Sequence, residues 1–251
     1  MLIQTLKNLA SDWLPLPVHR MVRRVQIAFA SPPIGQVEFG HLRRTEPISR
    51  AFGYDRGLPI DRYYIEGFLA AHSHEIRGRV LEIGENTYTK RFGSEYVEQS
   101  DVLFPSSNLP AATIIADLAD GANIPSDTFD CILCTQTLHV IYDYRAAIAT
   151  LHRILKPGGI LLATLPVNSQ LCYPEGNRWG DYWRFTRLAA EKLFKEMFPG
   201  GDVQVQAYGS VLTITGFLYG LSSDDLTPSE LDHHDPDYQL CLSVRAVKAS
   251  A

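Results

Sequence analysis

The sequence is poor in the features that mark secreted, membrane-spanning and disulfide-rich proteins. Only four of its 251 residues are cysteines, which argues against a disulfide scaffold and fits a reducing compartment. No apolar run approaches the roughly 18 residues that a transmembrane helix needs. The first residues also lack the order of basic, apolar and cleavage regions found in a signal peptide. We therefore expect a cytoplasmic protein.

An excess of basic charge is also absent. The 23 Lys and Arg and 28 Asp and Glu give a net charge of −5. A nucleic-acid footprint over the whole chain is thus not supported, and we expect no nucleic-acid partner. The charge is uneven, because residues 1–50 carry seven basic and three acidic side chains, whereas residues 221–240 carry six acids and no Lys or Arg. The arginines in 43–56 either hold an anionic molecule such as a sugar phosphate or pair with this acidic stretch.

Apolar residues near the start recur with the spacing of one helical face, at Leu2, Leu6, Leu9 and Trp13. A second short segment, 19–27, mixes arginines with apolar residues. A basic amphipathic helix of this kind either lies on an anionic membrane or, more often, packs on its own domain or a partner. Peripheral membrane contact through the N-terminal helix is therefore one expectation. We assign residues 1–60 to a helical and irregular extension and 61–251 to the main domain.

Seven β-like runs follow one another along the main domain. They are 79–83, 95–101, 112–117, 129–136, 160–166, 203–208 and 238–247. A helix that Asp61 is predicted to cap leads into the first run, and helices at 143–155 and 188–197 separate later ones. Strand and helix alternation predicts a parallel sheet with right-handed crossovers. The last two runs have no obvious helix between them, so we expect an antiparallel pair at the sheet edge.

The connections between the first three runs are short. About ten residues, 85–94 and 102–111, separate them, whereas a full crossover usually needs a dozen or more. The helices there must be one turn long or replaced by loops. We therefore predict an α/β fold with a seven-stranded, mostly parallel, Rossmann-like sheet, an antiparallel last strand, shortened first crossovers and an N-terminal helical extension.

Gly84 ends the first run and marks the expected site. Ligands of open α/β sheets bind outside the carboxyl ends of the strands, and a glycine lets a ligand approach the backbone closely. Gly84 is followed by Glu85, Asn86 and Thr87 without further glycines. The glycine pattern that cradles a dinucleotide phosphate is therefore missing, which argues against a nicotinamide dehydrogenase.

An ordered set of motifs from 79 to 166 resembles class I S-adenosylmethionine-dependent methyltransferases. Val-Leu-Glu-Ile-Gly at 80–84 is similar to their first motif, and Asp117 with the segment 124–132 is similar to their acidic residue and the entry to strand four. Leu138-His139 resembles the Leu-Glu-His that often follows, and 151–159 matches the stretch before strand five. The flanking segments 56–64 and 180–186 resemble a bacterial subgroup often associated with glycan and glycosyltransferase systems.

The resemblance implies S-adenosylmethionine as the cofactor. Its ribose hydroxyls suit a carboxylate at the end of strand two, where we place Asp101, 17 residues after Gly84, with Glu98 as the alternative. The resemblance also places Asp117 near the adenine amino group and Leu118 on the ring. For both aspartates, a solvated cap or turn carboxylate is the competing interpretation. The remaining residues predicted at the cofactor site are Glu82, Gly84, Glu85, Asn86, Thr135 and Gln136.

The resemblance further implies methyl transfer, which we expect to an oxygen of a small molecule or glycan precursor. Such a nucleophile benefits from a general base, for which His139 is the first candidate and Asp181 another. Tyr182, Trp183 and Arg184 are the predicted acceptor-binding residues. Two alternatives stay open. His139 and the 177–186 loop are purely structural, or the whole domain is an inactive subunit beside a glycan-synthesis enzyme.

Two patterns that resemble metal or redox sites are interpreted otherwise. Cys131 and Cys134 lie three positions apart on one predicted strand, so their side chains face opposite sides of the sheet. The Asp- and His-rich stretch 232–237 lies among turn residues and is predicted to be a solvated loop. We accordingly predict no metal ligands.

Overall fold

The computed structural model describes residues 32–172 and 180–250. The predicted N-terminal helices, and with them the membrane contact, lie outside this part. The chain divides into two compact units, 1–45 and 46–251. The described part of the first unit contains one short 3₁₀ helix, Gly40–Leu42, and Arg43 over the ring of Phe39. The second unit holds the sheet, and the domain boundary at residue 61 stays a prediction.

Seven strands of the second unit form one sheet in the order β3-β2-β1-β4-β5-β7-β6. Strand β7 runs antiparallel to both of its neighbours, β5 and β6, and the other pairings of these strands are parallel, which confirms the predicted mostly parallel sheet with an antiparallel last strand. The strands are β1 Gly78–Ile83, β2 Val97–Phe104, β3 Ile114–Ile115, β4 Phe129–Thr135, β5 Leu155–Pro166, β6 Asp202–Tyr208 and β7 Cys241–Val247. From β1 the chain first builds the sheet outward through β2 and β3, and it then crosses back to add β4 on the other side of β1. The switch point therefore lies at the carboxyl ends of β1 and β4.

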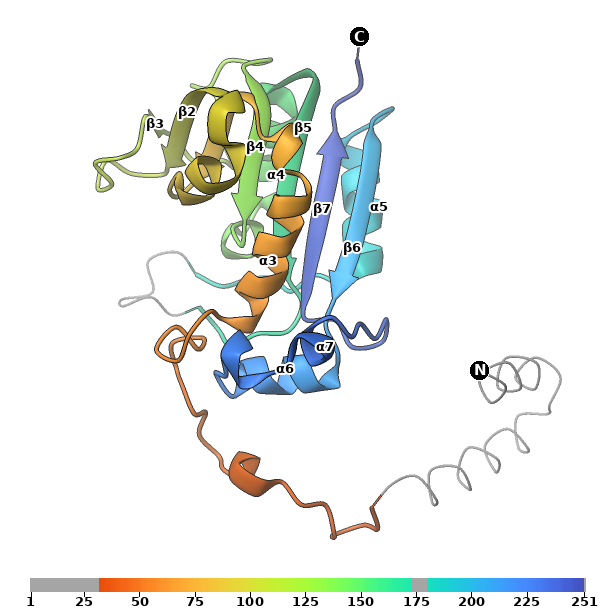
Figure 1. Ribbon diagram of the computed structural model, residues 1–251. Coiled ribbons are helices and arrows are strands. Elements are labelled where there is room, and N and C mark those ends of the chain that lie inside the picture. The colour runs from red at the N-terminus through yellow and green to blue at the C-terminus, as the bar shows by residue number, and fades with distance from the viewer. Residues whose placement is uncertain (1–31, 173–179, 251) are drawn as a thin grey trace, which may run out of the picture. The chain divides into compact units, whose positions relative to one another are not determined.

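Helices cover both faces of this sheet (Figure 1). Helix α3, Ile60–Ala71, buries its apolar face on one side, while α4, Tyr144–Ile154, and α5, Arg187–Met197, cover the other. The two hydrophobic clusters so formed contain the two cysteines of β4. Cys131 is buried on the α3 side and Cys134 on the α4 side, as predicted for positions three apart on a strand.

The short first crossovers are confirmed. A five-residue π-helix, Thr89–Gly93, and a 3₁₀ helix, Ser94–Tyr96, join β1 to β2, and turns alone join β2 to β3. Glu82 fixes the first of these connections. Its buried carboxylate accepts the backbone N–H groups of Tyr88 and Thr89 and the Thr89 hydroxyl.

Several boundaries differ from the prediction. Helix α3 begins at Ile60 after Pro59, so Asp61 lies inside its first turn and does not cap it. Strand β5 begins five residues earlier than predicted and contains a register shift opposite Phe129. The expectation of no helix between the last two strands is also wrong. Helices α6, Val211–Leu218, and α7, Pro228–Leu231, lie there, because a Ser210–Thr213 capping box starts a helix in an apolar run.

One long-range ion pair joins the basic and acidic segments of the sequence. The Arg56 guanidinium lies 2.6 Å from a carboxylate oxygen of Asp225. For Arg56 the structure thus shows the pairing with the acidic stretch. No helix among the described residues is both long and apolar enough to cross a membrane.

Candidate active site

A cavity of about 490 Å³ lies at the carboxyl ends of β1, β2 and β4, where the topology places the switch point. Gly84 forms part of its wall with a backbone φ of +93°, and nothing lies within 4 Å of the position that a Cβ would take. The predicted residues Asp117, Leu118 and Gln136 also line it. The lining residues that the sequence did not predict are Ile83, Leu103, Phe104, Pro105, Ala116, Ala119, Thr137, Val140, Ile141, Tyr142 and Asp143.

The electrostatics of this first cavity suit a cation. Asp117 and Asp143 are the charged side chains among the described residues that line it, and no Lys or Arg does. Asp117 follows β3 and accepts the N–H of Ala119 at 2.8 Å. Asp143 caps α4 by accepting the N–H of Ala146. Two carboxylates beside apolar walls favour a ligand that combines positive charge with a planar apolar group.

Asp101 does not line the cavity. Strand β2 continues three residues past it, so the prediction that Asp101 ends the strand is wrong, and the strand ends at Phe104. The Asp101 side chain is buried and accepts hydrogen bonds from Arg79, Gln99 and Thr113. Glu98, the alternative, lies still earlier on β2 and is exposed. The observed contacts of Asp101 therefore tie β1, β2 and the approach to β3 together.

Four other predicted cofactor residues lie around the cavity without lining it. Burial raises the pKa of Glu82, although the hydrogen bonds from Thr89 and Tyr88 oppose this shift. Glu85 is exposed and accepts the hydroxyl of Thr87, while Asn86 donates to Ser100 at 3.4 Å. The carbonyl of Thr135 accepts the hydroxyl of Thr137. These side chains shape the connections that carry the wall.

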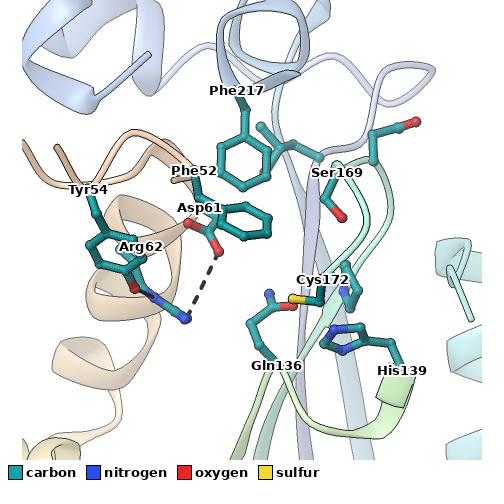
Figure 2. Close-up of a pocket in the computed structure, with 12 residues that line it drawn as sticks. Phe52, Tyr54, Asp61, Arg62, Gln136, His139, Ser169, Cys172 and Phe217 are labelled. Atoms are coloured by element: carbon teal, nitrogen blue, oxygen red, sulfur yellow. Dashed lines mark hydrogen bonds and ion pairs between the residues drawn. The ribbon is translucent and has the colours of Figure 1, made fainter. Parts of the chain in front are cut away.

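A second cavity, of about 260 Å³, shares the lining residue Gln136 with the first, and Figure 2 shows its other walls. Asp61 and Arg62 of α3 form one wall, and Gln136, His139 and Cys172 face them. The other lining residues are Phe52, Tyr54, Pro166, Asn168, Ser169, Phe217 and Leu240.

Gln136 lines both cavities and is held in an uncommon backbone conformation. Its φ is +46°, in the left-handed region that non-glycine residues seldom occupy. Its N–H lies 3.1 Å from the carbonyl and 3.2 Å from the hydroxyl of Thr164, and its amide nitrogen lies 3.5 Å from the sulfur of Cys241. Strain of this kind often accompanies functional positions, and here it fixes the residue between the two cavities.

His139 brings a buried imidazole to the second cavity. Its carbonyl accepts the N–H groups of Tyr182 and Trp183, while its Nδ1 has no hydrogen-bond partner among the described residues. Burial lowers the pKa of His139 to about 4, and the charge of Asp181 only partly opposes this shift. The imidazole is therefore neutral at pH 7 and has a lone pair that can accept a proton.

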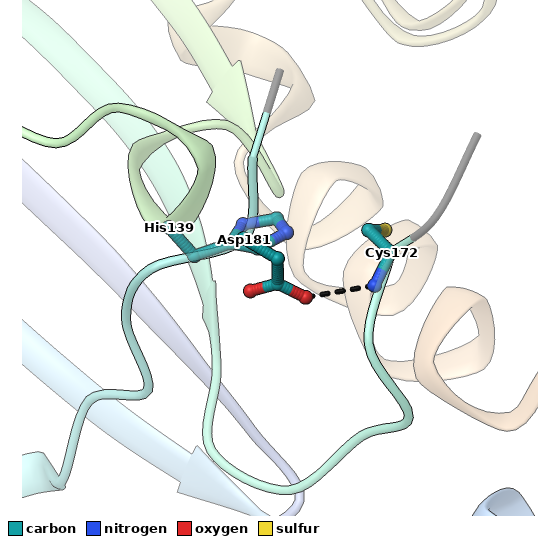
Figure 3. Close-up of side chains that lie close together, drawn as sticks. All are labelled: His139, Cys172 and Asp181. Atoms are coloured by element: carbon teal, nitrogen blue, oxygen red, sulfur yellow. Dashed lines mark hydrogen bonds between the residues drawn. The ribbon is translucent and has the colours of Figure 1, made fainter. Parts of the chain in front are cut away.

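Asp181 lies close to this imidazole (Figure 3). Polar atoms of His139, Cys172 and Asp181 all lie within 4.8 Å of one another. Burial alone would raise the pKa of Asp181, but hydrogen bonds from Arg184 and the Cys172 N–H keep it below its ordinary value. Burial also raises the pKa of the Cys172 thiol. Although these three residue types can bind metals, the guanidinium on Asp181 repels a cation, so we interpret them as a hydrogen-bonding group.

The three predicted acceptor-binding residues have different places. Tyr182 lines the first cavity, where its ring packs edge-on against Tyr142. Trp183 packs on Tyr142 and Tyr144 and donates its indole N–H to the Tyr142 carbonyl. The Arg184 guanidinium is engaged by Asp181 and by two backbone carbonyls. Neither Trp183 nor Arg184 is among the lining residues of either cavity.

The sequence matches a known family of protein domains. The model of a methyltransferase domain family matches residues 53–203, which is more than half of the chain. No curated protein sequence matches. The chain belongs to this methyltransferase domain family. It is an enzyme of the transferase class, and its methyl donor is S-adenosylmethionine.

Solved structures agree with the fold. A methyltransferase from Thermotoga maritima, described as a possible histamine N-methyltransferase, has a TM-score of 0.50 and 18% identity, covering 78% of this chain and 94% of its own. An S-adenosylmethionine-dependent methyltransferase from Mesorhizobium loti has the same score and identity, covering 78% and 100%. The [4+2]-cyclase SpnF is equally similar, covering 78% and 84%. Such different descriptions on one fold leave the acceptor to be argued from the site.

Proposed function

We propose that the enzyme transfers the methyl group of S-adenosylmethionine to an oxygen of a small molecule or glycan precursor. In this proposal the cofactor occupies the first cavity. Asp117 and Asp143 offset its positive charge, Gly84 allows it to approach the backbone, and Leu118 packs on its adenine. The acceptor occupies the second cavity. Gln136 carries the proposal, because a residue shared by two cavities brings a donor and an acceptor side by side.

For this methyl transfer the protein must orient the donor and the acceptor and provide one proton acceptor. The sulfonium already activates the methyl group, so transfer is an in-line displacement that proximity accelerates. A neutral His139 beside the acceptor accepts the hydroxyl proton as the new carbon–oxygen bond forms. Asp181 lies within 4.8 Å and stabilises the resulting imidazolium. His139 is thus the proposed base, and Asp181 a positioning residue.

The sequence resemblance extends the proposal to a bacterial, glycan-associated subgroup. We infer a cytoplasmic enzyme that makes peripheral membrane contact through the N-terminal helix. The competing interpretation, an inactive subunit, predicts cofactor binding without transfer to any acceptor.

A transfer assay tests the proposal. The purified chain is incubated with S-adenosylmethionine carrying a labelled methyl group and with a panel of monosaccharides, nucleotide sugars and small hydroxylated compounds. We expect label in at least one oxygen acceptor, and a loss of 100-fold or more in turnover for His139→Gln. The control is His152→Gln on α4, which lies outside both cavities. Cofactor binding with no transfer to any member of the panel would favour the inactive subunit.

A further inference from the structure

Two buried side-chain nitrogens in the described part of the chain have no hydrogen-bond partner. They are Nη1 of Arg62 and Nδ1 of His139, and both residues line the second cavity. Buried polar atoms in folded proteins are nearly always hydrogen-bonded, so each exception needs an explanation. Because both residues line one cavity, we interpret the two atoms as groups for which a ligand supplies the partners.

Arg62 has spare capacity for an anion. Its Nε donates to the hydroxyl of Tyr54 at 2.8 Å, but its Nη1 lies 3.9 Å from a carboxylate oxygen of Asp61. That distance permits an ion pair and excludes a hydrogen bond. Burial raises the pKa of Asp61, although the charge of Arg62 opposes this shift, so the carboxylate is a weakened partner.

Arg184 shows what a fully engaged arginine looks like in the same region. Both terminal nitrogens of its guanidinium donate to the Asp181 carboxylate, and they also reach the carbonyls of Trp183 and Gln170. Such an arginine fixes the fold and has little left for a ligand. Arg62 carries the same charge and the same fork of donors without this set of partners.

We propose, on the basis of the methyl transfer proposed above, that the acceptor is an organic acid whose anionic oxygen binds Arg62 while its hydroxyl lies at His139. Guanidinium groups recognise carboxylate and phosphate oxygens with paired donors, so either anion meets the requirement. Arg62 and His139 lie on facing walls (Figure 2). The acceptor must therefore span the cavity, as a sugar acid or a sugar phosphate does. Asn168 and Ser169 offer neutral hydrogen-bonding groups beside it.

Calorimetry with matched probes tests this inference on the full chain saturated with S-adenosylhomocysteine. The probes are glucose, glucuronate and glucose 6-phosphate, together with lactate and its neutral amide. We expect at least one acid to bind ten-fold or more tightly than its neutral counterpart. The affinities of glucuronate and glucose 6-phosphate show whether the bound anion is a carboxylate or a phosphate. Equal binding of acids and neutral counterparts, or no binding of any acid, overturns the proposal.

Variants locate the effect. Arg62→Leu should abolish the preference for acids, Arg62→Lys should retain part of it, and Asp61→Asn should tighten acid binding several-fold because it removes the competing carboxylate. The control is Arg91→Leu, whose arginine pairs with Glu66 and lines neither cavity. If Arg62→Leu fails to fold, Arg62→Lys and Asp61→Asn still decide. An undiminished preference in either arginine variant contradicts the proposal.

The outcome is separable from that of the methyl transfer itself. S-adenosylhomocysteine binding is measured first for every variant, so a loss of acid binding cannot be mistaken for a loss of the cofactor site. Acid binding through Arg62 without methyl transfer to any acceptor, acid or neutral, would leave the anion site standing and refute the proposed function. Methyl transfer that is confined to neutral acceptors would support the proposed function and refute the organic acid as acceptor.

Discussion

The Nε of Arg79 donates a 2.8 Å hydrogen bond to the carboxylate of Asp101, and this pair joins β1 to β2 in the interior of the sheet. Thr113 donates to the other carboxylate oxygen, which ties in the approach to β3. The residue expected to bind the cofactor ribose therefore accepts hydrogen bonds within the fold at both of its carboxylate oxygens. The end of β2, which lines the first cavity, offers Phe104 in its place.

Asp101→Asn is accordingly expected to change stability rather than cofactor affinity. The amide has no charge to pair with the Arg79 guanidinium and one acceptor oxygen in place of two, so we expect the free energy of unfolding to fall by about 2 kcal/mol. Denaturant unfolding measures this loss, and calorimetry with S-adenosylmethionine should give an unchanged dissociation constant. Glu98→Gln on the same strand is the exposed control. A weakened cofactor with unchanged stability would restore the ribose role of Asp101.

Gln136→Gly separates backbone strain from side-chain function. Glycine adopts positive φ without strain, so the folded state should keep its stability or gain up to about 1 kcal/mol. Turnover should nevertheless fall at least ten-fold, because the side chain between the two cavities is lost. Denaturant unfolding measures the stability of the variant, and steady-state kinetics measure its turnover.

Asp127→Gly is the matched control for that change. Asp127 also has a positive φ, +52°, but lies outside both cavities and pairs with Lys248. The Asp127→Gly substitution should leave turnover unchanged. Full turnover in Gln136→Gly would show that the two cavities do not cooperate through this residue.

The buried His139 predicts a particular pH dependence of stability. Its pKa is about 4 in the folded state, below the ordinary value near 6.5 of the unfolded chain. The unfolded state therefore takes up a proton first as the pH falls. The stability from this group is complete above pH 6.5 and is lost between 6.5 and 4, by about 2 kcal/mol from pH 7 to pH 5.

Unfolding free energies at pH 7 and pH 5 check this expectation. In His139→Gln the difference between the two pH values should shrink by about that amount, while contributions from other histidines remain. The transfer rate should stay level from pH 8 to pH 6, since the imidazole is already neutral there. An undiminished pH difference in the variant would mean that His139 titrates normally.

Local signals in the sequence were sufficient to predict the fold and several residues that line the first cavity. Gly84 after an apolar run marked the switch point, and Asp117 and Gln136 follow later strands at the same edge. These inferences succeed because the carboxyl ends of parallel strands meet at one place. The prediction that Asp101 ends β2 was wrong because spacing along the chain does not fix where a strand stops. Strand β2 continues through Val102, Leu103 and Phe104, of which valine and phenylalanine favour extended structure.

The lining of the second cavity could not be predicted from the sequence, for a different reason. Its walls come from α3, the end of β4, the segment after β5 and α6, so no local pattern contains them. Asp61 was interpreted as a helix cap, and Arg62 was not singled out. Only the packing of α3 against α6 shows that Arg62 faces His139. The helix α6 was itself missed, because its apolar run shows no polar face from which to read a period.

The most direct test of the central claim is calorimetric titration of the full chain and of Gly84→Val with S-adenosylmethionine. Valine at this position places a side chain in the first cavity, so the unmodified chain should bind one equivalent and the variant at least 100-fold more weakly. Gly35→Val is the control. Gly35 has a similar φ of +83° and open space around it, but lies outside the cavity. Full affinity in a folded Gly84→Val would contradict our placement of the cofactor.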